Sequence, residues 1–231
     1  MPDRYQIAIT SSEHVTAIAY PAAARNRAGI CLMLAHGAGG DQTSSFMVRF
    51  AGDLAARGLD TITFNFLYSE RRRGVPDRND KLEACYRRMI DAYGDGLFEK
   101  SFNCRNFAIG GKSMGGRIAS QVLATGSDGI VGLVLLGYPL HPPGRPEELR
   151  DRHLPDIGVP MLFVQGSRDA FGTPDELAPI LKGLRAPAEL CVVQGGDHSY
   201  KVPKRAGRTQ EQVYQFVLDE VERWLRARSI L

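Results

Sequence analysis

Short hydrophobic runs, separated by stretches of helical spacing, make up most of the chain from residue 30 onward. Each run has the length of a buried β-strand, and strands that alternate with helices are typical of βαβ units and of a mostly parallel sheet. One run, IVGLVLL at 130–136, has no polar residue and predicts a central strand that helices cover on both faces. The expected strands are Ile30–Ala35, Thr61–Phe66, Phe107–Gly110, Ile130–Leu136, Met161–Val164 and Leu190–Val193.

The N-terminal segment, residues 1–20, follows a different pattern. Tyr5, Ile7 and Ile9 alternate with polar positions, which is the period of a half-buried β-strand. Polar residues at 10–13 then interrupt the pattern before a second apolar stretch at 14–20. Two short strands joined by a polar turn indicate a hairpin. We therefore expect an antiparallel hairpin at one edge of the sheet.

Helix signals fill the stretches between the expected strands. Asp80 and Glu83 have the spacing of a capping box. Thr173 is a stronger start signal, because a proline follows it at the first helical position and Glu176 stands three residues on. Thr209 begins a last amphipathic stretch. These signals predict that every crossover between strands is helical.

The chain has 231 residues and carries no internal repeat, low-complexity tract or long linker. Its length is ordinary for an α/β protein with one core, so we expect a single domain over 1–231. The Pro-rich stretch 138–160 is too short to form a large lid and indicates an excursion over the C-terminal edge of the sheet. The predicted architecture is an α/β fold with a mostly parallel sheet, an antiparallel N-terminal hairpin and helices on both faces.

Composition excludes several classes of protein without naming a function. Hydrophobic residues at 43% and charged residues at 24% are ordinary globular values, and a net charge of +3 is too small to indicate a nucleic-acid partner. The N-terminus lacks the pattern of a secretion signal, and no window is apolar enough for a membrane span. The cysteines have no C-x-x-C spacing, which favours free thiols and a cytoplasmic location over a disulfide or zinc framework. They are Cys31, Cys85, Cys104 and Cys191.

Ser113 lies in the sequence GGKSMGG, between the expected strand 107–110 and a helical stretch that follows it. A serine hydroxyl becomes a useful nucleophile when a sharp strand-to-helix turn presents it next to a base. Such a turn needs small residues two positions before and after the serine, and Gly111 and Gly115 supply them. This pattern, in its strand-turn-helix context, predicts Ser113 as the nucleophile of an acyl-transfer enzyme.

A general base and an acid must follow, because chains of this architecture place the three residues in the order serine, acid, histidine. His198 comes directly after the expected strand 190–193, so we place it at the same edge of the sheet as Ser113. Asp169 follows the preceding strand and is expected to face His198. We predict that His198 takes the serine proton and that Asp169 holds the imidazole in the correct tautomer. Asp197 is the alternative acid.

The negative charge of a tetrahedral intermediate needs preorganised N–H donors, which form an oxyanion hole. The backbone N–H of Met114, at the start of the helix after the expected nucleophile, is one candidate. The second is expected in the glycine-rich loop after strand 30–35, where we favour Ala38 and place Gly39 next. His36 precedes the nucleophile in the chain, and we expect it to brace this loop rather than to act as the base.

Other readings of the same glycines fail. GKS at 111–113 ends like a P-loop, but the required glycine five residues before Gly111 is Asn106. GAG at 37–39 begins like a dinucleotide fingerprint, but the third glycine is replaced by Gln42. A hydrolase for carbon-halogen bonds or epoxides would carry aspartate at the elbow, where this chain has serine.

Basic residues gather on loops at the expected active edge. An arginine run at 71–73 follows the expected strand 61–66, and Lys112 and Lys201 flank the expected nucleophile and base. We predict that at least one of these arginines binds a carboxylate or phosphate on the substrate, because a guanidinium provides both bidentate orientation and charge neutralisation. The alternative is a solvated basic loop. The predicted substrate-binding residues are Arg71, Arg72, Arg73 and Lys112.

Several linked motifs together resemble a known family. They are HGAGG at 36–40, FNFLYSERRRGVPD at 64–77, GGKSMGGR at 110–117, GSRDAFGTPDEL at 166–177 and GGDHSY at 195–200. Over about residues 14–228 the chain is similar to the dienelactone-hydrolase-like part of the α/β-hydrolase superfamily, and most of all to the predicted-hydrolase family that includes testis-expressed protein 30. The resemblance implies an α/β-hydrolase fold, a catalytic triad of Ser113, Asp169 and His198, and no metal or organic cofactor. Dienelactone hydrolases typically carry cysteine where this chain has Ser113, so the substrate does not follow from the resemblance.

We therefore expect a serine hydrolase that cleaves a small ester or thioester, acts on a small-molecule acyl substrate with an anionic group, and has no nucleic-acid or membrane partner. A lipase for long buried chains is disfavoured, because the sequence offers no large lid. The alternative is a hydrolase-fold scaffold that binds a protein partner without catalysis. The complete set of serine, acid and base argues against that alternative.

Overall fold

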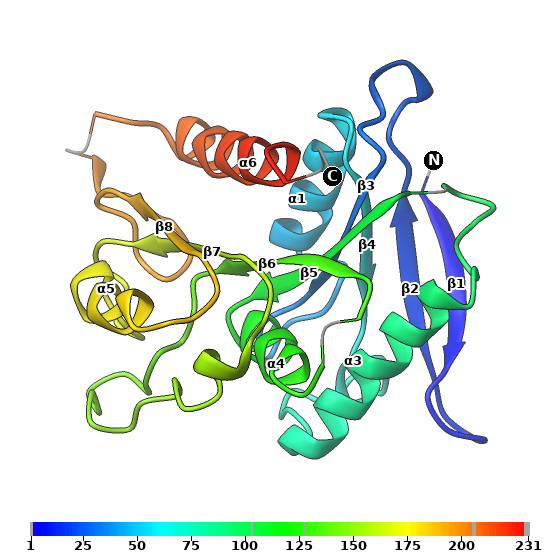
Figure 1. Cartoon of the computed structure of the whole chain (residues 1–231), viewed down its shortest axis with the longest axis horizontal. Helices are drawn as coiled ribbons and strands as arrows, with labels where there is room; N and C mark the ends of the chain where they lie inside the picture. The colour runs from blue at the N-terminus through cyan, green and yellow to red at the C-terminus, as the bar shows by residue number, and fades with distance from the viewer. Residues whose placement is uncertain (1, 103, 127, 205–206, 229–231) are drawn as a thin grey trace.

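The computed structural model describes residues 2–102, 104–126, 128–204 and 207–228. The strands are β1 (Asp3–Ala8), β2 (His14–Tyr20), β3 (Ile30–Ala35), β4 (Asp60–Phe64), β5 (Asn106–Lys112), β6 (Ile130–Leu136), β7 (Met161–Gly166) and β8 (Ala188–Val193). In this part of the chain they form one 8-stranded sheet in the order β1-β2-β4-β3-β5-β6-β7-β8 (Figure 1). β2 is antiparallel to both of its neighbours, and every later pair is parallel. The mostly parallel sheet and the N-terminal hairpin are thus confirmed.

The central strands β3, β6 and β7 lack polar alternation because both of their faces are buried. Along β3, Ile30, Leu32 and Leu34 belong to one hydrophobic core, whereas the residues between them belong to the other. Each face of the sheet therefore carries its own core, and each core needs a helical cover.

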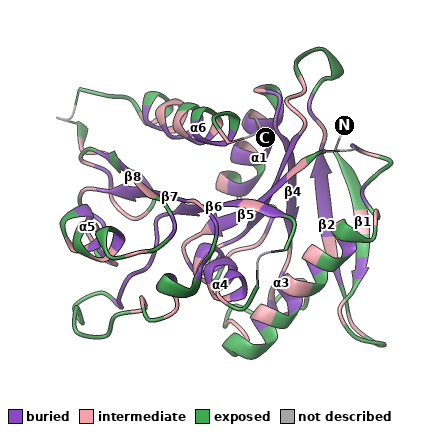
Figure 2. Ribbon diagram, in the orientation of Figure 1, coloured by how far each residue is buried: buried purple, intermediate pink, exposed green. Residues whose placement is uncertain are grey.

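Helices lie on both faces of the sheet, as Figure 1 shows. The helices are α1 (Ser45–Ala56), α2 (Leu67–Glu70), α3 (Asn79–Gly94), α4 (Met114–Leu123), α5 (Pro174–Lys182) and α6 (Gln210–Arg226). The buried residues of α1 and α6 join one core, and those of α3, α4 and α5 join the other. In Figure 2 the buried residues lie along the sheet and the inner sides of the helices, and the exposed residues lie on the outer sides. Among the described residues, no helix is long and apolar enough to cross a membrane.

The capping signals in the sequence meet different outcomes. Thr173 and Thr209 each form a complete capping box at the start of α5 and α6. The capping box expected at Asp80 is wrong, because the cap is Arg78, two residues earlier, and it makes no side-chain cap bond. Asp80 lies in the first turn of α3 instead, where a carboxylate interacts favourably with the helix dipole.

The connection from β6 to β7 departs from the expectation that every crossover is helical. In residues 137–160 it contains only one short 3₁₀ helix, η2 (Leu154–Asp156). Leu140 and Leu154 in this segment are buried in the same core as α4, and the His153 Nε2 lies 2.8 Å from the Ser120 Oγ of α4. Side-chain packing of an irregular segment thus covers the sheet where a helix was expected. As described, the connection forms no large lid over the C-terminal edge of the sheet.

Candidate active site

Ser113 lies on the sharp turn between β5 and α4, with φ 52° and ψ −118°. Strain of this kind in a non-glycine residue costs on the order of 1–3 kcal/mol and is concentrated at functional sites. The Ser113 N–H donates to the Leu136 carbonyl oxygen at 2.9 Å, which holds the turn to β6. A Cβ added at Gly111 or Gly115 would lie only 2.6 Å or 2.4 Å from the Ala35 carbonyl oxygen. Glycine at both positions therefore lets α4 pack against β3 while the turn presents the hydroxyl.

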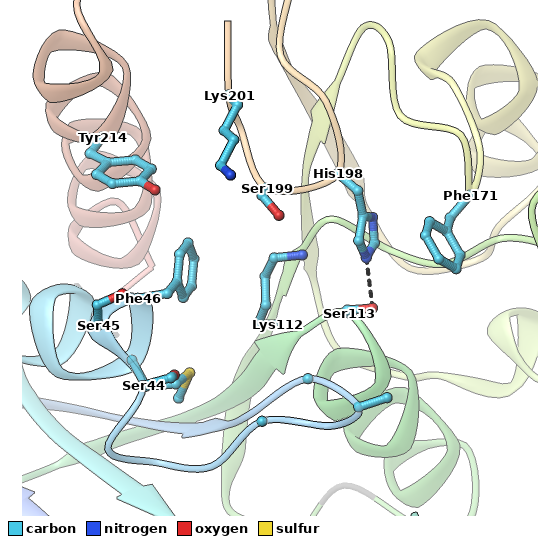
Figure 3. Close-up of a pocket in the computed structure, with 14 residues that line it drawn as sticks. Ser44, Ser45, Phe46, Lys112, Ser113, Phe171, His198, Ser199, Lys201 and Tyr214 are labelled. Atoms are coloured by element: carbon cyan, nitrogen blue, oxygen red, sulfur yellow. Dashed lines mark hydrogen bonds between the residues drawn. The ribbon is translucent and has the colours of Figure 1, made fainter. Parts of the chain in front are cut away.

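The His198 imidazole lies beside this hydroxyl (Figure 3). Its Nε2 is 2.8 Å from the Ser113 Oγ. His198 emerges from the loop after β8, at the edge of the sheet where β5 also ends. The Phe171 ring packs against the imidazole with 4.3 Å between ring centroids. Phe171 thus fixes the orientation of the imidazole, and the His198 side chain is still 21% exposed, so a small molecule can reach it.

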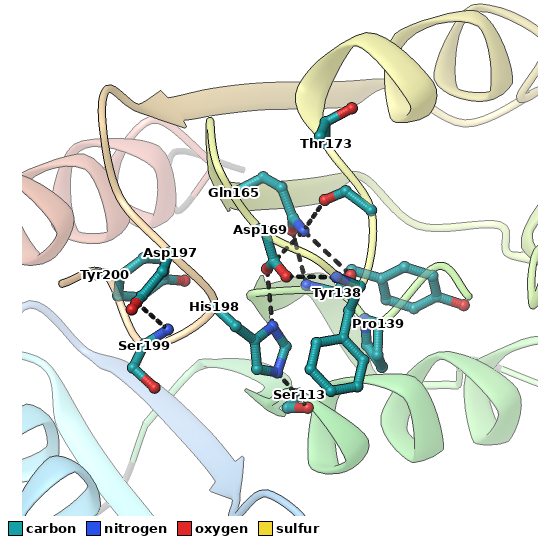
Figure 4. Close-up of polar contacts among 12 residues, drawn as sticks. Ser113, Tyr138, Pro139, Gln165, Asp169, Thr173, Asp197, His198, Ser199 and Tyr200 are labelled. Atoms are coloured by element: carbon teal, nitrogen blue, oxygen red, sulfur yellow. Dashed lines mark hydrogen bonds and ion pairs between the residues drawn. The ribbon is translucent and has the colours of Figure 1, made fainter. Parts of the chain in front are cut away.

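Asp169 binds the other nitrogen of the imidazole (Figure 4). Its Oδ2 lies 2.7 Å from the His198 Nδ1 and also accepts a hydrogen bond from the Gln165 Nε2 at 2.9 Å. Its Oδ1 accepts the backbone N–H of Phe171 at 2.9 Å, and the carboxylate is fully buried. An ionised carboxylate only accepts hydrogen bonds, so the Nδ1 carries a hydrogen. The Nε2 of the neutral ring then directs its lone pair at the hydroxyl of Ser113.

Asp197, the alternative acid, binds backbone N–H groups of its own loop and, within the described residues, makes no hydrogen bond to the imidazole. Its Oδ1 accepts the backbone N–H groups of Ser199 at 2.8 Å and Lys201 at 2.9 Å. These bonds close the loop that carries His198, together with Tyr200, which is buried at φ 61°. The structure thus brings Ser113, Asp169 and His198 into one hydrogen-bonded chain and assigns Asp197 to the backbone of the loop.

The expected oxyanion donors lie around Ser113. Met114 is the first residue of α4, and N–H groups in the first turn of a helix have no intrahelical acceptor. The loop after β3 turns at Gly37–Gly40, where the Gly40 N–H donates to the Gly37 carbonyl oxygen at 3.3 Å and Gly39 has φ 70°. Ala38 lines both of the cavities that meet at Ser113, whereas neither is lined by Gly39. The position of Ala38 therefore favours it as the second donor.

His36 connects this loop to the segment after β4 through hydrogen bonds of both ring nitrogens. It is fully buried and accepts the Phe66 N–H on its Nε2 at 3.2 Å. Its Nδ1 donates to the Gly37 carbonyl oxygen at 2.9 Å. Burial lowers the pKa of the imidazole, which keeps the ring neutral and consistent with one donated and one accepted bond.

Two cavities meet at Ser113. The larger, of about 460 Å³, lies between His198, the N-terminus of α1 and the first turns of α6 (Figure 3). The smaller, of about 260 Å³, lies over the start of α4. Both sizes suit a small molecule rather than a long acyl chain. Polar and aromatic residues of the larger cavity include Ser44, Phe46, Lys112, Ser199, Lys201 and Tyr214.

Lys112 ends β5 and directs its side chain into the larger cavity, as Figure 3 shows. Its Nζ lies 5.9 Å from the centroid of the Tyr200 ring. Burial lowers the pKa of this ammonium to about 8, an effect that the charges of Asp169 and Asp197 partly oppose. With a pKa of about 8, Lys112 is mostly protonated at neutral pH and carries positive charge at the wall of the larger cavity.

The arginine run lines neither cavity, although Arg73 binds Asp77, which lines the smaller one. Arg71 forms an ion pair with Glu13 of the β1–β2 turn, and Arg73 binds Asp77 at 2.8 Å. Arg72 is exposed. Of the described residues that line the two cavities, none belongs to 71–73. Their predicted role in substrate binding stays a prediction, and the basic residues at the cavities are instead Lys112, Lys201, Arg117 and Arg150.

Sequence reasoning missed Gln165, which positions the acid. This glutamine is fully buried at the end of β7, and its Nε2 donates to Asp169 and to the carbonyl oxygens of Tyr138 at 3.2 Å and Gly172 at 2.7 Å (Figure 4). The signal was an amide at the end of an otherwise apolar run, MLFVQ, because a polar residue in a buried strand needs partners.

Metal binding has no comparable candidate: the described residues contain no group of three or more His, Cys, Asp or Glu side chains placed to hold an ion.

Known proteins share this fold. The profile of a family described as an alpha/beta hydrolase domain matches residues 28–226. Among solved structures, Est1E from Butyrivibrio proteoclasticus is similar at a TM-score of 0.75 and 15% identity, covering 97% of this chain and 98% of that chain. Dienelactone hydrolase from Anabaena variabilis is similar at a TM-score of 0.70 and 18% identity, covering 98% of each chain. A lidless α/β serine hydrolase from Xanthomonas campestris is similar at a TM-score of 0.72 and 16% identity, covering 96% and 94%.

Proposed function

The chain belongs to the α/β-hydrolase domain family, and we propose that it is a serine hydrolase that cleaves a small carboxylic ester or thioester through an acyl-enzyme on Ser113. The observation that carries this proposal is the unbroken hydrogen-bonded chain at the C-terminal edge of the sheet. The Ser113 Oγ lies 2.8 Å from the His198 Nε2, and the His198 Nδ1 lies 2.7 Å from the Asp169 Oδ2. Residues 1–231 act as one domain in this scheme.

In the first step, acylation, a proton moves from Ser113 to His198 while Asp169 stays ionised. As the Ser113 Oγ attacks the acyl carbon, its proton moves to the His198 Nε2, which is free to accept it. The resulting imidazolium is stabilised by the buried carboxylate of Asp169. Gln165 and the Phe171 N–H hold that carboxylate in place, so little reorganisation is needed during the reaction.

Charge that develops on the carbonyl oxygen is met by backbone donors. The Met114 N–H and the Ala38 N–H flank the nucleophile, one from the first turn of α4 and one from the loop after β3. Fixed donors of this kind contribute about 3–4 kcal/mol each to transition-state stabilisation in serine proteases.

The second half of the reaction reverses the first. The imidazolium gives its proton to the departing alcohol or thiol, and the carbon–heteroatom bond breaks to leave an ester on the Ser113 Oγ. Water then takes the place of the leaving group, with His198 again as the base, and releases the carboxylic acid and free serine. Thioesters require less help at the first step, because a thiolate leaves more readily than an alkoxide.

Substitution of the nucleophile tests this function. We expect Ser113→Ala to lower kcat by on the order of a millionfold, by analogy with serine proteases. Folding should be retained, since Ser113 is half-buried on a turn rather than in either core. The measurement is turnover of a panel of acyl-nitrophenyl esters and acyl-thioesters, with circular dichroism as the folding control.

The same panel separates an enzyme from a scaffold. Wild-type turnover that survives in Ser113→Ala would contradict the nucleophile assignment. A wild-type protein that hydrolyses no member of the panel, and reacts with a fluorophosphonate no faster than Ser113→Ala does, would be a hydrolase-fold scaffold.

A further inference from the structure

We propose that the larger cavity beside Ser113 receives the leaving group of the substrate, and that Lys112 and Lys201 bind a carboxylate or phosphate on that leaving group. This inference rests on the proposed hydrolase function and adds the substrate class to it. The substrate is then an ester or thioester whose alcohol or thiol part is anionic.

His198 must protonate the leaving group, and the oxyanion donors must face the carbonyl oxygen; together these two requirements decide which cavity the leaving group enters. His198 lines the larger cavity and not the smaller one, whereas Met114 lines only the smaller one. The departing oxygen or sulfur must take its proton from the His198 Nε2, and the developing oxyanion must face the Met114 N–H. On the tetrahedral carbon bonded to the Ser113 Oγ, the leaving group is therefore directed into the larger cavity.

The basic side chains that line this cavity have no ion-pair partner among the described residues that line it. Of the described residues that line it, Lys112 and Lys201 are basic and none carries a carboxylate. Neither lysine forms an ion pair with a carboxylate of the described chain, and the recorded contact of Lys112 is with the Tyr200 ring. Asp169 and Asp197 are the charges that face Lys112, but their oxygens already accept bonds from His198 and from backbone N–H groups. An anion in the cavity would give the ammonium groups the partner they lack.

The N-terminus of α1 adds to this positive field. Ser44, Ser45, Phe46 and Met47 line the same cavity and form the cap and first turn of the 12-residue helix. The first N–H groups of a helix have no intrahelical acceptor and carry the positive end of the helix dipole. No acidic residue lies in this first turn, and the Ser44 side chain makes no cap bond. The helix end and the two lysines thus converge on one volume from different elements.

The smaller cavity offers a useful contrast. It also contains arginines, but Arg117 donates to Asn79 at 3.1 Å and Arg150 donates to the Pro139 carbonyl oxygen at 3.2 Å. A carboxylate, Asp77, lines this cavity as well. The guanidinium groups thus have neutral hydrogen-bond acceptors within the protein but no ion pair among the described residues, and Asp77 binds Arg73. The anionic group is assigned to the leaving group because the larger cavity combines two lysines and a helix N-terminus with no carboxylate in its described lining, whereas Asp77 lines the smaller cavity.

Matched acetate esters test the assignment. 4-Acetoxybenzoate and 4-acetoxyphenyl phosphate carry the anion on the leaving group, and methyl 4-acetoxybenzoate is their neutral counterpart. An anion on the acyl side is supplied by the 4-nitrophenyl monoester of glutaric acid, with 4-nitrophenyl valerate as its neutral counterpart. Each kcat/KM is divided by the rate constant for hydrolysis by hydroxide, so that differences in intrinsic reactivity cancel.

We expect wild-type protein to prefer one or both esters with an anionic leaving group over the neutral ester. Lys112→Met and Lys201→Met should each lower this ratio by about tenfold, which corresponds to about 1.4 kcal/mol. Lys182→Met is the matched control, because Lys182 is exposed at the far end of α5 and does not line the cavity. It should leave the ratio at its wild-type value.

Three results would overturn the inference while the proposed function stands: Ser113-dependent hydrolysis with no preference for the anionic leaving group, a preference only for the anionic acyl group, or a preference that Lys112→Met and Lys201→Met leave intact. If no ester is hydrolysed, calorimetry on Ser113→Ala measures directly whether the cavity binds an anionic leaving group. We expect 4-hydroxybenzoate or 4-hydroxyphenyl phosphate to bind more tightly than methyl 4-hydroxybenzoate, and we expect Lys112→Met to remove the difference. Equal affinities would contradict it.

Discussion

Two aspartates lie close to His198, and their hydrogen bonds separate their roles. Asp169 is buried and accepts bonds from the His198 ring, the Gln165 amide and a backbone N–H. Asp197 accepts two backbone N–H groups of its own loop. The proposed mechanism needs a negative charge only in the first arrangement, because an amide oxygen can also accept backbone N–H groups but stabilises an imidazolium much less than a carboxylate does.

Substitution by asparagine therefore distinguishes the two residues. Asp169→Asn should lower kcat by roughly a thousandfold to ten-thousandfold, because the imidazole loses its fixed tautomer and the charge behind it. Asp197→Asn should keep most of the activity. The measurement is kcat on one hydrolysed nitrophenyl ester, with thermal unfolding as the control for stability. A silent Asp169→Asn beside an inactive Asp197→Asn would mean that Asp197 is the acid.

The titration of Lys112 gives a prediction for pH. Burial lowers its pKa to about 8, so the side chain is charged below about pH 8 and neutral above it. The preference for an anionic over a neutral leaving group should therefore be greatest near pH 7 and should decline as the pH rises from 7 to 9. Asp169, Asp197, His198, Tyr200 and Lys201 also face or adjoin this ammonium.

Lys112→Met separates its titration from theirs. The ratio of kcat/KM for the two esters should change little with pH in that variant, because the group that titrates is gone. A wild-type ratio that stays constant from pH 7 to 9, or a decline that persists in Lys112→Met, would contradict the assignment of the titration to Lys112.

At the scale of the elements, the elbow depends on the close approach of β3, β5 and α4. The Ala35 carbonyl oxygen of β3 lies 2.6 Å from the position of a Cβ at Gly111 and 2.4 Å from that of a Cβ at Gly115, closer than a normal contact. Backbone atoms cannot move aside as a flexible side chain can, so a larger residue at either position must shift the helix or the turn.

Gly115→Ala should therefore reduce both stability and turnover. We expect the free energy of unfolding to fall by about 1–3 kcal/mol, and kcat to fall because the Ser113 turn shifts relative to His198. Gly52→Ala in α1 is the matched control, since a Cβ there meets no atom within 4 Å and alanine favours the helix by about 1 kcal/mol. Urea unfolding and ester turnover measure both effects. A Gly115→Ala protein as stable and active as Gly52→Ala would contradict the tight packing of the elbow.

Local signals predicted most elements, but not all of them. The central strands β3, β6 and β7 were recognisable because both faces of each are buried. Thr173 marks its helix because cap, proline and glutamate are all local. Asp80 and Glu83 match the same spacing, yet the helix begins at Asn79, since extending a helix by two residues at its start costs little. The Pro-rich stretch 138–160 was expected as an excursion, but its burial was not, because that burial comes from contacts distant in sequence.

At the scale of the whole molecule, topology brings distant residues to one edge of the sheet. The order serine, acid, histidine and their places after β5, β7 and β8 could be predicted, because the ends of parallel strands meet at that edge. The hydrogen-bond and ion-pair partners of individual side chains could not be predicted from the sequence. Arg71 pairs with Glu13 of the hairpin turn, and Gln165 binds Asp169 across a buried loop. Such pairings depend on the packed loops, which is why the arginine run looked like an anion site in the sequence.

The central claim is that His198 and Asp169 activate Ser113 as a nucleophile, and covalent labelling tests it most directly. A fluorophosphonate should add once to the wild-type protein, with the adduct located on Ser113 by peptide mass spectrometry. The labelling rate should fall by on the order of a thousandfold or more in His198→Ala, and Ser113→Ala should not be labelled. A wild-type protein that reacts no faster than Ser113→Ala, or an adduct on another residue, would contradict the account.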